Sequence, residues 1–131
     1  MNSDSLCRLE DAISVCRLCP LGQTRVHTVP GAGPVPARVM LVGEAPGREE
    51  DLSGKPFVGR GGRLLDQALQ HAGLDRSEVF ITSVIKCRPP NNRKPLKMEV
   101  ASCLPYLQAQ IDIVQPRVVC LLGNTAAAAL L

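Results

Sequence analysis

The chain has 131 residues, a net charge of +3 and only 2% aromatic residues, namely two Phe, one Tyr and no Trp. This length predicts a single domain, residues 1–131. So few aromatic rings exclude a protein that binds single-stranded nucleic acid by stacking many bases. The slight excess of basic side chains permits a polyanionic partner without requiring one.

The N-terminal segment is polar and acidic, so it lacks the apolar core of a signal peptide. No apolar run in the sequence reaches transmembrane length. We therefore expect a cytosolic, monomeric protein with no membrane partner. In a reducing compartment the six cysteines should be metal ligands or buried thiols, because disulfide frameworks belong to oxidising compartments.

Hydrophobic periodicity predicts helices alternating with apolar strands. The expected helices are 5–15, 61–71, 97–114 and 126–131, and the expected strands are 38–42, 79–85 and 117–122. This order predicts an α/β fold of three layers, α/β/α, with a central and mainly parallel sheet. Because the last helix is short and its apolar residues have no following element, we expect the fold to be incomplete at its C-terminal end.

Several local features are expected inside these elements. Ser3 or Asp4 should cap the first helix, and Pro105 should kink or split the long helix. Residues 123–125 should cap the last helix. Cys120 lies in an apolar strand and should pack in the core.

The stretch from Val39 to Leu65 is the most informative part of the sequence. An apolar strand leads into a turn of small residues, Gly43 to Gly47, and then into an acidic triplet and a second Gly-rich break around Phe57. Open α/β sheets bind ligands beside the carboxyl ends of their strands, so we expect a pocket here with Phe57 in its wall. The pattern matches neither a dinucleotide fingerprint nor a P-loop. A plain strand–turn–helix connection is the alternative.

Four of the cysteines lie in loops or near element ends, where their side chains can converge: Cys16, Cys19, Cys87 and Cys103. Such a set fits either zinc or an iron–sulfur cluster. The lack of a second Cys-x2-Cys pair slightly favours a cluster, and four unrelated thiols are the remaining alternative. Cys7 has no partner at metal-ligand spacing.

A basic, Pro-rich loop follows the second expected strand. It begins at Lys86 and carries Arg88, Arg93 and Lys94. A metal bound by the four cysteines would clamp this loop to the N-terminal loop. We predict that Arg88, Arg93 and Lys94 contact phosphate groups of a partner, with a solvated surface loop as the alternative.

Taken together, these stretches resemble the family-four uracil-DNA glycosylases, the iron–sulfur branch of their superfamily. The resemblance spans Cys16 to Leu131. It rests on the turn Gly43-Glu-Ala-Pro-Gly47, on the run from Glu49 to Gly59, on the run from Ile81 to Arg93, and on the four cysteines at family spacing.

This resemblance implies a DNA glycosylase of base excision repair, which hydrolyses the N-glycosidic bond of uracil in single- or double-stranded DNA. It implies a structural 4Fe-4S cluster on Cys16, Cys19, Cys87 and Cys103, in preference to zinc. The cluster would take no part in redox turnover.

The resemblance also implies a pocket for a base flipped out of DNA. Gly43, Glu44 and Ala45 would line the uracil pocket. Phe57 would stack on the uracil ring.

Acidic residues near the turn would perform the chemistry in this resemblance. Glu44, with Glu50 and Asp51 as rivals, would position water or stabilise the positive charge that develops on the sugar. Ser83 would contact the uracil edge. The family commonly has Asn at this position, and a single hydroxyl cannot make the bidentate contact of an amide.

A second departure concerns the family's C-terminal His-Pro motif, which this sequence lacks. His27 and His71 lie elsewhere, and we expect both to be surface histidines.

Three functions therefore compete. The first is a monofunctional glycosylase, although Lys55 is near enough in sequence to keep a lyase step open. The second is a truncated, non-catalytic iron–sulfur module that binds nucleic acid, which Ser83 and the missing motif favour and Phe57 opposes. The third is a zinc-bound interaction domain.

Overall fold

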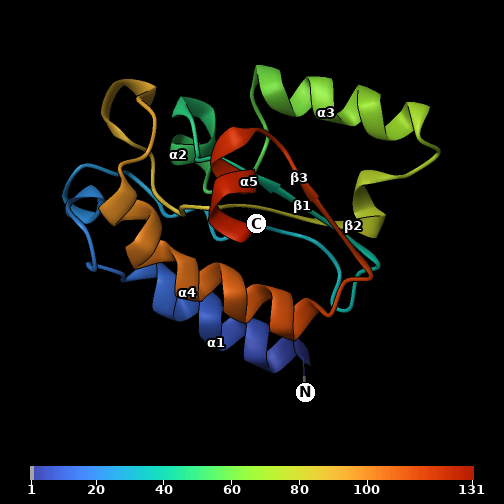
Figure 1. Ribbon diagram of the computed structural model, residues 1–131, viewed down its shortest axis with the longest axis horizontal. Coiled ribbons are helices and arrows are strands. Elements are labelled where there is room, and N and C mark those ends of the chain that lie inside the picture. The colour runs from blue at the N-terminus through green and yellow to red at the C-terminus, as the bar shows by residue number, and fades with distance from the viewer. Residues whose placement is uncertain (1) are drawn as a thin grey trace.

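Three parallel strands form the middle layer of the computed structural model, which describes residues 2–131 (Figure 1). The strands are β1 (Val39–Gly43), β2 (Val79–Ser83) and β3 (Val118–Leu121). The helices are α1 (Asn2–Ser14), α2 (Arg48–Ser53), α3 (Arg60–His71), α4 (Lys97–Val114) and α5 (Asn124–Leu130). Short 3-10 turns are η1 (Pro20–Gln23), η2 (Arg76–Glu78) and η3 (Pro90–Asn92).

The strand order is β2–β1–β3, and β1 pairs in parallel with both of its neighbours. Val39 lies opposite Val79 in β2 and opposite Val118 in β3. The same register brings Gly43 and Ser83 side by side at the carboxyl ends of their strands. The predicted parallel sheet is confirmed.

Alternate residues of β1 and β2 face two hydrophobic cores, as the two-residue period of a strand requires. Met40 and Phe80 face α4, where Leu107 is fully buried. Leu41 packs with Leu69 of α3 on the opposite face. Because α1 lies beside α4 on the first face, helices cover both faces of the sheet, and the predicted three layers are confirmed (Figure 1).

The outer edge of β2 is covered by residues 31–33. Ala32 and Ile81 exchange two backbone hydrogen bonds, 2.9 and 2.8 Å long. A Cβ on Gly33 would lie 2.5 Å from the Cα of Phe80, so only glycine lets the chain approach this closely. All five residues of β2 are consequently buried.

The opposite edge strand, β3, is more exposed than its apolar sequence predicts. Val119 and Leu121 pack against the core beneath α4. The strand period therefore directs Cys120 to the other face. Cys120 is exposed there, so the prediction that it packs in the core is wrong.

Several element ends differ from the sequence prediction. Ser3 and Asp4 lie inside α1 rather than at its cap. α4 is one continuous helix across Pro105, which is exposed, so the carbonyl group that the proline leaves without its helical partner lies on the solvent side. α5 takes Gly123 as its N-cap, and β2 ends at Ser83. Within residues 2–131, no helix combines the length and apolarity of a membrane span.

Leu107→Ala is expected to lower the free energy of unfolding by about 2–5 kcal/mol, because it leaves a cavity where the side chain is fully buried. Leu64→Ala is the matched control, since Leu64 is 67% exposed on α3. Urea unfolding of both variants checks this prediction. Equal unfolding midpoints for the two variants would contradict the assignment of Leu107 to the core.

Candidate functional site

A cleft of about 400 Å³ opens at the carboxyl ends of β1 and β2. Its walls come from the turn after β1, the second Gly-rich segment, the end of β2 and the loop before α4. Cleft-lining residues include Glu44, Ala45, Arg48, Glu49, Glu50, Phe57, Arg60, Ser83, Asn92 and Arg93. This is the edge of an open α/β sheet where ligands bind, and the volume suits a small molecule or a single base.

Phe57 forms one wall of the cleft, as the sequence predicted. Its ring lies so close to Gly43 that a Cβ on that glycine would be 2.5 Å from the ring atom Cζ. Gly43 is therefore covered by the ring and supports it from behind. Phe57 has a φ of 50°, a left-handed conformation that costs a non-glycine residue of order 1–3 kcal/mol.

The acidic segment after the turn, expected as a loop, forms the short helix α2. Gly47 is its N-cap, and the carboxylate of Glu50 accepts a 3.0 Å hydrogen bond from the Gly47 N–H, as in a capping box. Acidic residues in the first turn also suit the positive end of the helix dipole. Gly54, with a φ of 74°, ends the helix. The spacing from Gly47 to Glu50 was the signal that sequence reasoning missed.

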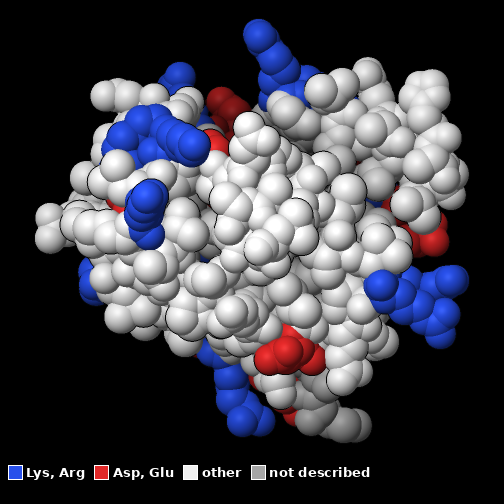
Figure 2. Space-filling view, viewed as in Figure 1, with Lys and Arg blue, Asp and Glu red and all other residues white. Residues whose placement is uncertain are grey.

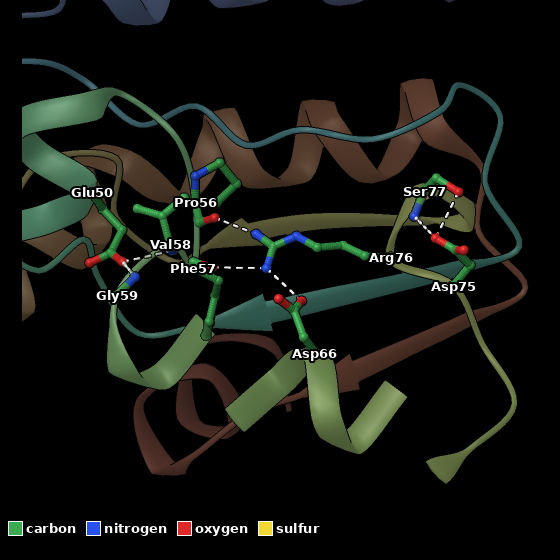
Figure 3. A network of polar contacts seen from close by, with 9 residues as sticks. All are labelled: Glu50, Pro56, Phe57, Val58, Gly59, Asp66, Asp75, Arg76 and Ser77. Atoms are coloured by element: carbon green, nitrogen blue, oxygen red, sulfur yellow. Dashed lines mark hydrogen bonds and ion pairs between the residues drawn. The ribbon is translucent and has the colours of Figure 1, made fainter. Parts of the chain in front are cut away.

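The carboxylate of Glu50 joins α2 to the second Gly-rich segment. Its Oε2 accepts hydrogen bonds from the N–H groups of Val58 and Gly59, both at 2.9 Å (Figure 3). Burial alone would raise the pKa of Glu50, but the N–H donors of Gly59, Val58 and Gly47 outweigh it and hold this pKa below its usual value. Both oxygens of Glu50 are thus occupied by backbone donors.

Asp51 is buried and ties α2 to the loop after η1. Its Oδ1 accepts hydrogen bonds from the N–H of Val26 at 2.9 Å and the N–H of His27 at 3.3 Å. The His27 ring also contacts the Asp51 carbonyl oxygen at 2.9 Å. Asp51 is not among the cleft-lining residues. His27 and His71 are both exposed, as expected.

Glu44 lines the cleft, and within residues 2–131 no backbone N–H donates to its carboxylate. The hydroxyl of Thr125, in the first turn of α5, donates a 2.5 Å hydrogen bond to its Oε2. Ser83 also lines the cleft, next to Gly43 in the sheet register. Sequence reasoning missed Thr125, because 81 positions separate it from Glu44.

Arginines stand at the rim of the cleft. Arg48 and Arg60 are exposed and open α2 and α3, each directly after the glycine that caps its helix. Sequence reasoning missed both of them, although the repeated Gly-Arg step was a visible signal. Arg93 also lines the cleft, but its guanidinium makes a bidentate ion pair with the buried Glu99, with both contacts at 2.8 Å.

The loop before α4 presents part of the predicted basic surface. Arg88 donates a 2.7 Å hydrogen bond from Nε to Asn92, and Lys94 is exposed. Figure 2 shows Lys and Arg side chains gathered over this loop, whereas the surface over α5 is uncharged. The hydrogen bonds from Arg93 lower the pKa of Glu99 despite its burial, so the ion pair fixes the base of the loop.

Lys86, expected in the same basic surface, is buried. Its Nζ donates hydrogen bonds to the Thr82 hydroxyl at 2.7 Å and to the Ser83 carbonyl oxygen at 2.5 Å. Burial lowers the pKa of Lys86 to about 7, and the nearby Cys103 acts in the other direction. Lys86 therefore does not contribute to the basic surface of the loop, which begins at Arg88.

The four predicted ligand cysteines differ in how they relate to the core beneath α4. Cys87 and Cys103 are buried in that core, and Cys19 packs against it. Cys16 acts electrostatically on both buried thiols. Their burial raises the pKa of Cys87 and raises the pKa of Cys103 to about 11.

N–H groups point at three of these sulfurs, as they do around metal-bound thiolates. Leu18 N–H donates to Cys16 at 3.5 Å, and Lys86 N–H donates to Cys103 at 3.3 Å. The guanidinium of Arg25 donates to the Cys87 sulfur at 3.4 Å and to the Cys16 carbonyl oxygen at 2.7 Å. Sequence reasoning did not assign Arg25 to this cluster of cysteines.

The four cysteines do not form a compact group of ligands in this structure. Among residues 2–131, no three His, Cys, Asp or Glu side chains lie close enough to bind one metal ion.

The chain belongs to the uracil-DNA glycosylase superfamily: the family model "Uracil DNA glycosylase superfamily" matches residues 30–131. The matched part contains the sheet, the cleft and the two buried cysteines.

Curated relatives are similar over most of the chain. It is 50% identical to a "Type-4 uracil-DNA glycosylase" of Sulfurisphaera tokodaii, over 92% of the chain and 56% of that protein. It is 52% identical to one of Pyrobaculum aerophilum, over 95% of the chain and 63% of that protein. For one of Thermotoga maritima the identity is 47%, over 90% of the chain and 62% of the relative. The chain thus spans less than two thirds of the length of these relatives.

Glu50→Gln is expected to lower the free energy of unfolding by about 1–2 kcal/mol at neutral pH, a figure that allows for partial exposure. The folded-state pKa of Glu50 lies below its ordinary value of 4.5. Its stabilising effect is therefore complete above that value and is lost as the pH falls through the folded pKa. Urea unfolding in buffers from neutral to acidic pH should show the difference from wild type shrinking.

The neighbouring exposed Glu49 provides the control, as Glu49→Gln removes a carboxylate from the same turn of α2. Its unfolding midpoint should stay within about 0.5 kcal/mol of wild type. A Glu50→Gln variant as stable as Glu49→Gln at neutral pH would show that the three backbone contacts contribute nothing.

Proposed function

We propose that the protein is a uracil-DNA glycosylase that hydrolyses the N-glycosidic bond between uracil and deoxyribose in DNA. The observation that carries this proposal is the cleft at the strand ends, where the Phe57 ring, the Glu44 carboxylate and the Ser83 hydroxyl come together. The names of the type-4 relatives support the same substrate.

Glu44 is the acidic residue we propose for the reaction. Water attacks C1′ of the sugar, the C1′–N1 bond breaks, and its electron pair leaves with uracil. The proton that the water loses passes through solvent to the uracil anion. Positive charge develops on the sugar, and a nearby carboxylate stabilises it. Glu50 and Asp51, the earlier rivals, hold backbone N–H groups instead, and the Thr125 hydroxyl holds one oxygen of Glu44 in place.

Base recognition is assigned to Phe57 and Ser83. A uracil flipped out of DNA would stack on the Phe57 ring. Ser83 would offer one hydroxyl to the uracil edge, and Ala45 would line the pocket beside it. Gly43 acts indirectly, because its missing side chain gives the ring its place.

The DNA backbone is expected to lie along the arginine rim. Arg48 and Arg60 are exposed beside the cleft, and phosphate contacts of this kind position a duplex without reading its sequence. Arg88 and Lys94 extend the basic surface along the loop before α4. Arg93 contributes less charge than predicted, because Glu99 neutralises it. The cytosolic location and the monomeric state remain predictions.

Cys16, Cys19, Cys87 and Cys103 are the residues we propose to hold a 4Fe-4S cluster. When bound, it would cross-link the N-terminal segment, the loop before α4 and α4 itself. Its role would be structural, because the cleft residues hold the groups needed for hydrolysis.

Glu44→Gln is expected to reduce the rate of uracil excision by roughly 100- to 10,000-fold, because it removes the charge that stabilises the sugar cation. The assay is single-turnover cleavage of a uracil-containing oligonucleotide by protein purified without air. Asp112→Asn is the control, since Asp112 is exposed on α4 and does not line the cleft. Excision by Glu44→Gln at the wild-type rate would eliminate Glu44 from the mechanism.

A second candidate is an iron–sulfur module that binds DNA without cleaving it, which the single hydroxyl of Ser83 favours. The same oligonucleotide separates the two candidates. Salt-dependent binding without excision by the wild-type protein would support this module and contradict the glycosylase.

Cys103→Ser is expected to lose the visible absorbance of the cluster and most of its iron, from about four atoms per chain in the wild type. Cys7→Ser and Cys120→Ser are matched controls, because both cysteines are exposed. Metal analysis and absorbance spectra check the result. Stoichiometric zinc without iron in the wild type would favour the zinc-bound interaction domain instead.

A further inference from the structure

The turn that carries Phe57 is not held by its own local conformation. Phe57 has a φ of 50°, a region that favours glycine over an aromatic residue. Phe57 is only partly buried, although it packs against the core cluster that contains Leu41 and Ile81. Contacts from other parts of the chain must therefore keep this turn in place.

Arg76 makes the most direct of these contacts. It lies in η2, ahead of β2, and its guanidinium reaches the turn across 19 sequence positions (Figure 3). Nη1 donates to the Phe57 carbonyl oxygen at 2.8 Å, and Nη2 donates to the Pro56 carbonyl oxygen at 2.5 Å. The planar guanidinium group thus binds two consecutive carbonyl groups.

Arg76 is itself held in two ways. Its Nη1 pairs with the carboxylate of Asp66 on α3 at 2.9 Å. Its backbone lies in a turn fixed by Asp75, whose carboxylate accepts 2.9 Å hydrogen bonds from the N–H and the hydroxyl of Ser77 (Figure 3). This turn leads directly into buried β2, so the position of the guanidinium is fixed relative to the central sheet.

Two glycines limit the turn from its other sides. A Cβ on Gly62 would lie 1.8 Å from the Phe57 carbonyl oxygen, so the first turn of α3 presses against the backbone of the turn. Gly43 supports the ring face. Arg76 is the one of these contacts made by a side chain outside the cleft lining, so it can be replaced without changing the identity of any cleft-lining residue.

We propose that Arg76 is a positioning residue that holds the Phe57 ring across the cleft by binding the carbonyl oxygens of Pro56 and Phe57. The ring's task as a platform for a base rests on the proposed function, whereas its position does not. Lysine cannot replace Arg76, because a single ammonium group lacks the fork that binds two carbonyl groups and a carboxylate together.

The test uses fluorine NMR of protein labelled with fluorophenylalanine. The chain has two Phe, so two signals are expected, and a Phe57→Leu variant assigns them. Phe80 is 0% exposed in the core and reports on folding. In Arg76→Lys the Phe57 signal should move toward the shift of the free amino acid and sharpen, while the Phe80 signal stays unchanged.

Asp66→Asn is the second variant, because it removes the charge that holds Arg76 while keeping an oxygen acceptor. It should shift the Phe57 signal in the same direction by a smaller amount. Arg117→Lys is the matched control, since Arg117 is exposed ahead of β3 and should leave both signals at their wild-type positions.

An unchanged Phe57 signal in Arg76→Lys would overturn the proposal. A shift of both the Phe57 and the Phe80 signals away from their wild-type positions would also overturn it, because Arg76 would then support the whole fold rather than the ring. Uracil excision adds a separate measurement: Arg76→Lys should slow the single-turnover rate by as much as about 100-fold with little change in DNA affinity. A wild type that excises no uracil would contradict the proposed function and leave the NMR result to decide the position of the ring.

Discussion

The candidate site depends on one carboxylate whose two oxygens are both bound by backbone groups. Glu50 gathers the N–H groups of Gly47, Val58 and Gly59, and so closes two Gly-rich segments into a single frame around the cleft. Charge-assisted hydrogen bonds of this kind are among the stronger ones available to a protein. Because backbone groups bind both oxygens of Glu50, the other carboxylates that line the cleft are those of Glu49 and of Glu44, which Thr125 contacts.

The ring of Phe57 shows how this frame carries local strain. The positive φ of Phe57 is unfavourable. Glycines leave room where other segments approach Phe57 most closely, and the guanidinium of Arg76 binds its carbonyl oxygen. The cleft wall is therefore built by long-range contacts from α3 and η2. Rigid placement of an aromatic platform reduces the entropy lost when a planar ligand binds.

Sequence reasoning correctly predicted the parts of the structure that depend on local patterns of residues. Apolar strands, helical periodicity and the turn at Gly43 predicted the parallel sheet and the place of the cleft. It failed where distant segments decide the outcome. The hydroxyl that binds Glu44 comes from Thr125, 81 positions away, and Lys86 looks like a surface residue until its buried acceptors are known. The exposure of Cys120 likewise depends on which face of β3 the helices cover.

The segment from Ile81 to Cys87 is buried at every position and joins Ser83, at the cleft, to Cys87. Lys86 fastens it internally through the Ser83 carbonyl oxygen, and its N–H meets the sulfur of Cys103. Because the segment is packed on all sides, its backbone cannot move away from the cleft to make room for a larger side chain. An amide side chain in place of Ser83 would therefore have to extend into the cleft itself, and it would reduce the space left for a ligand.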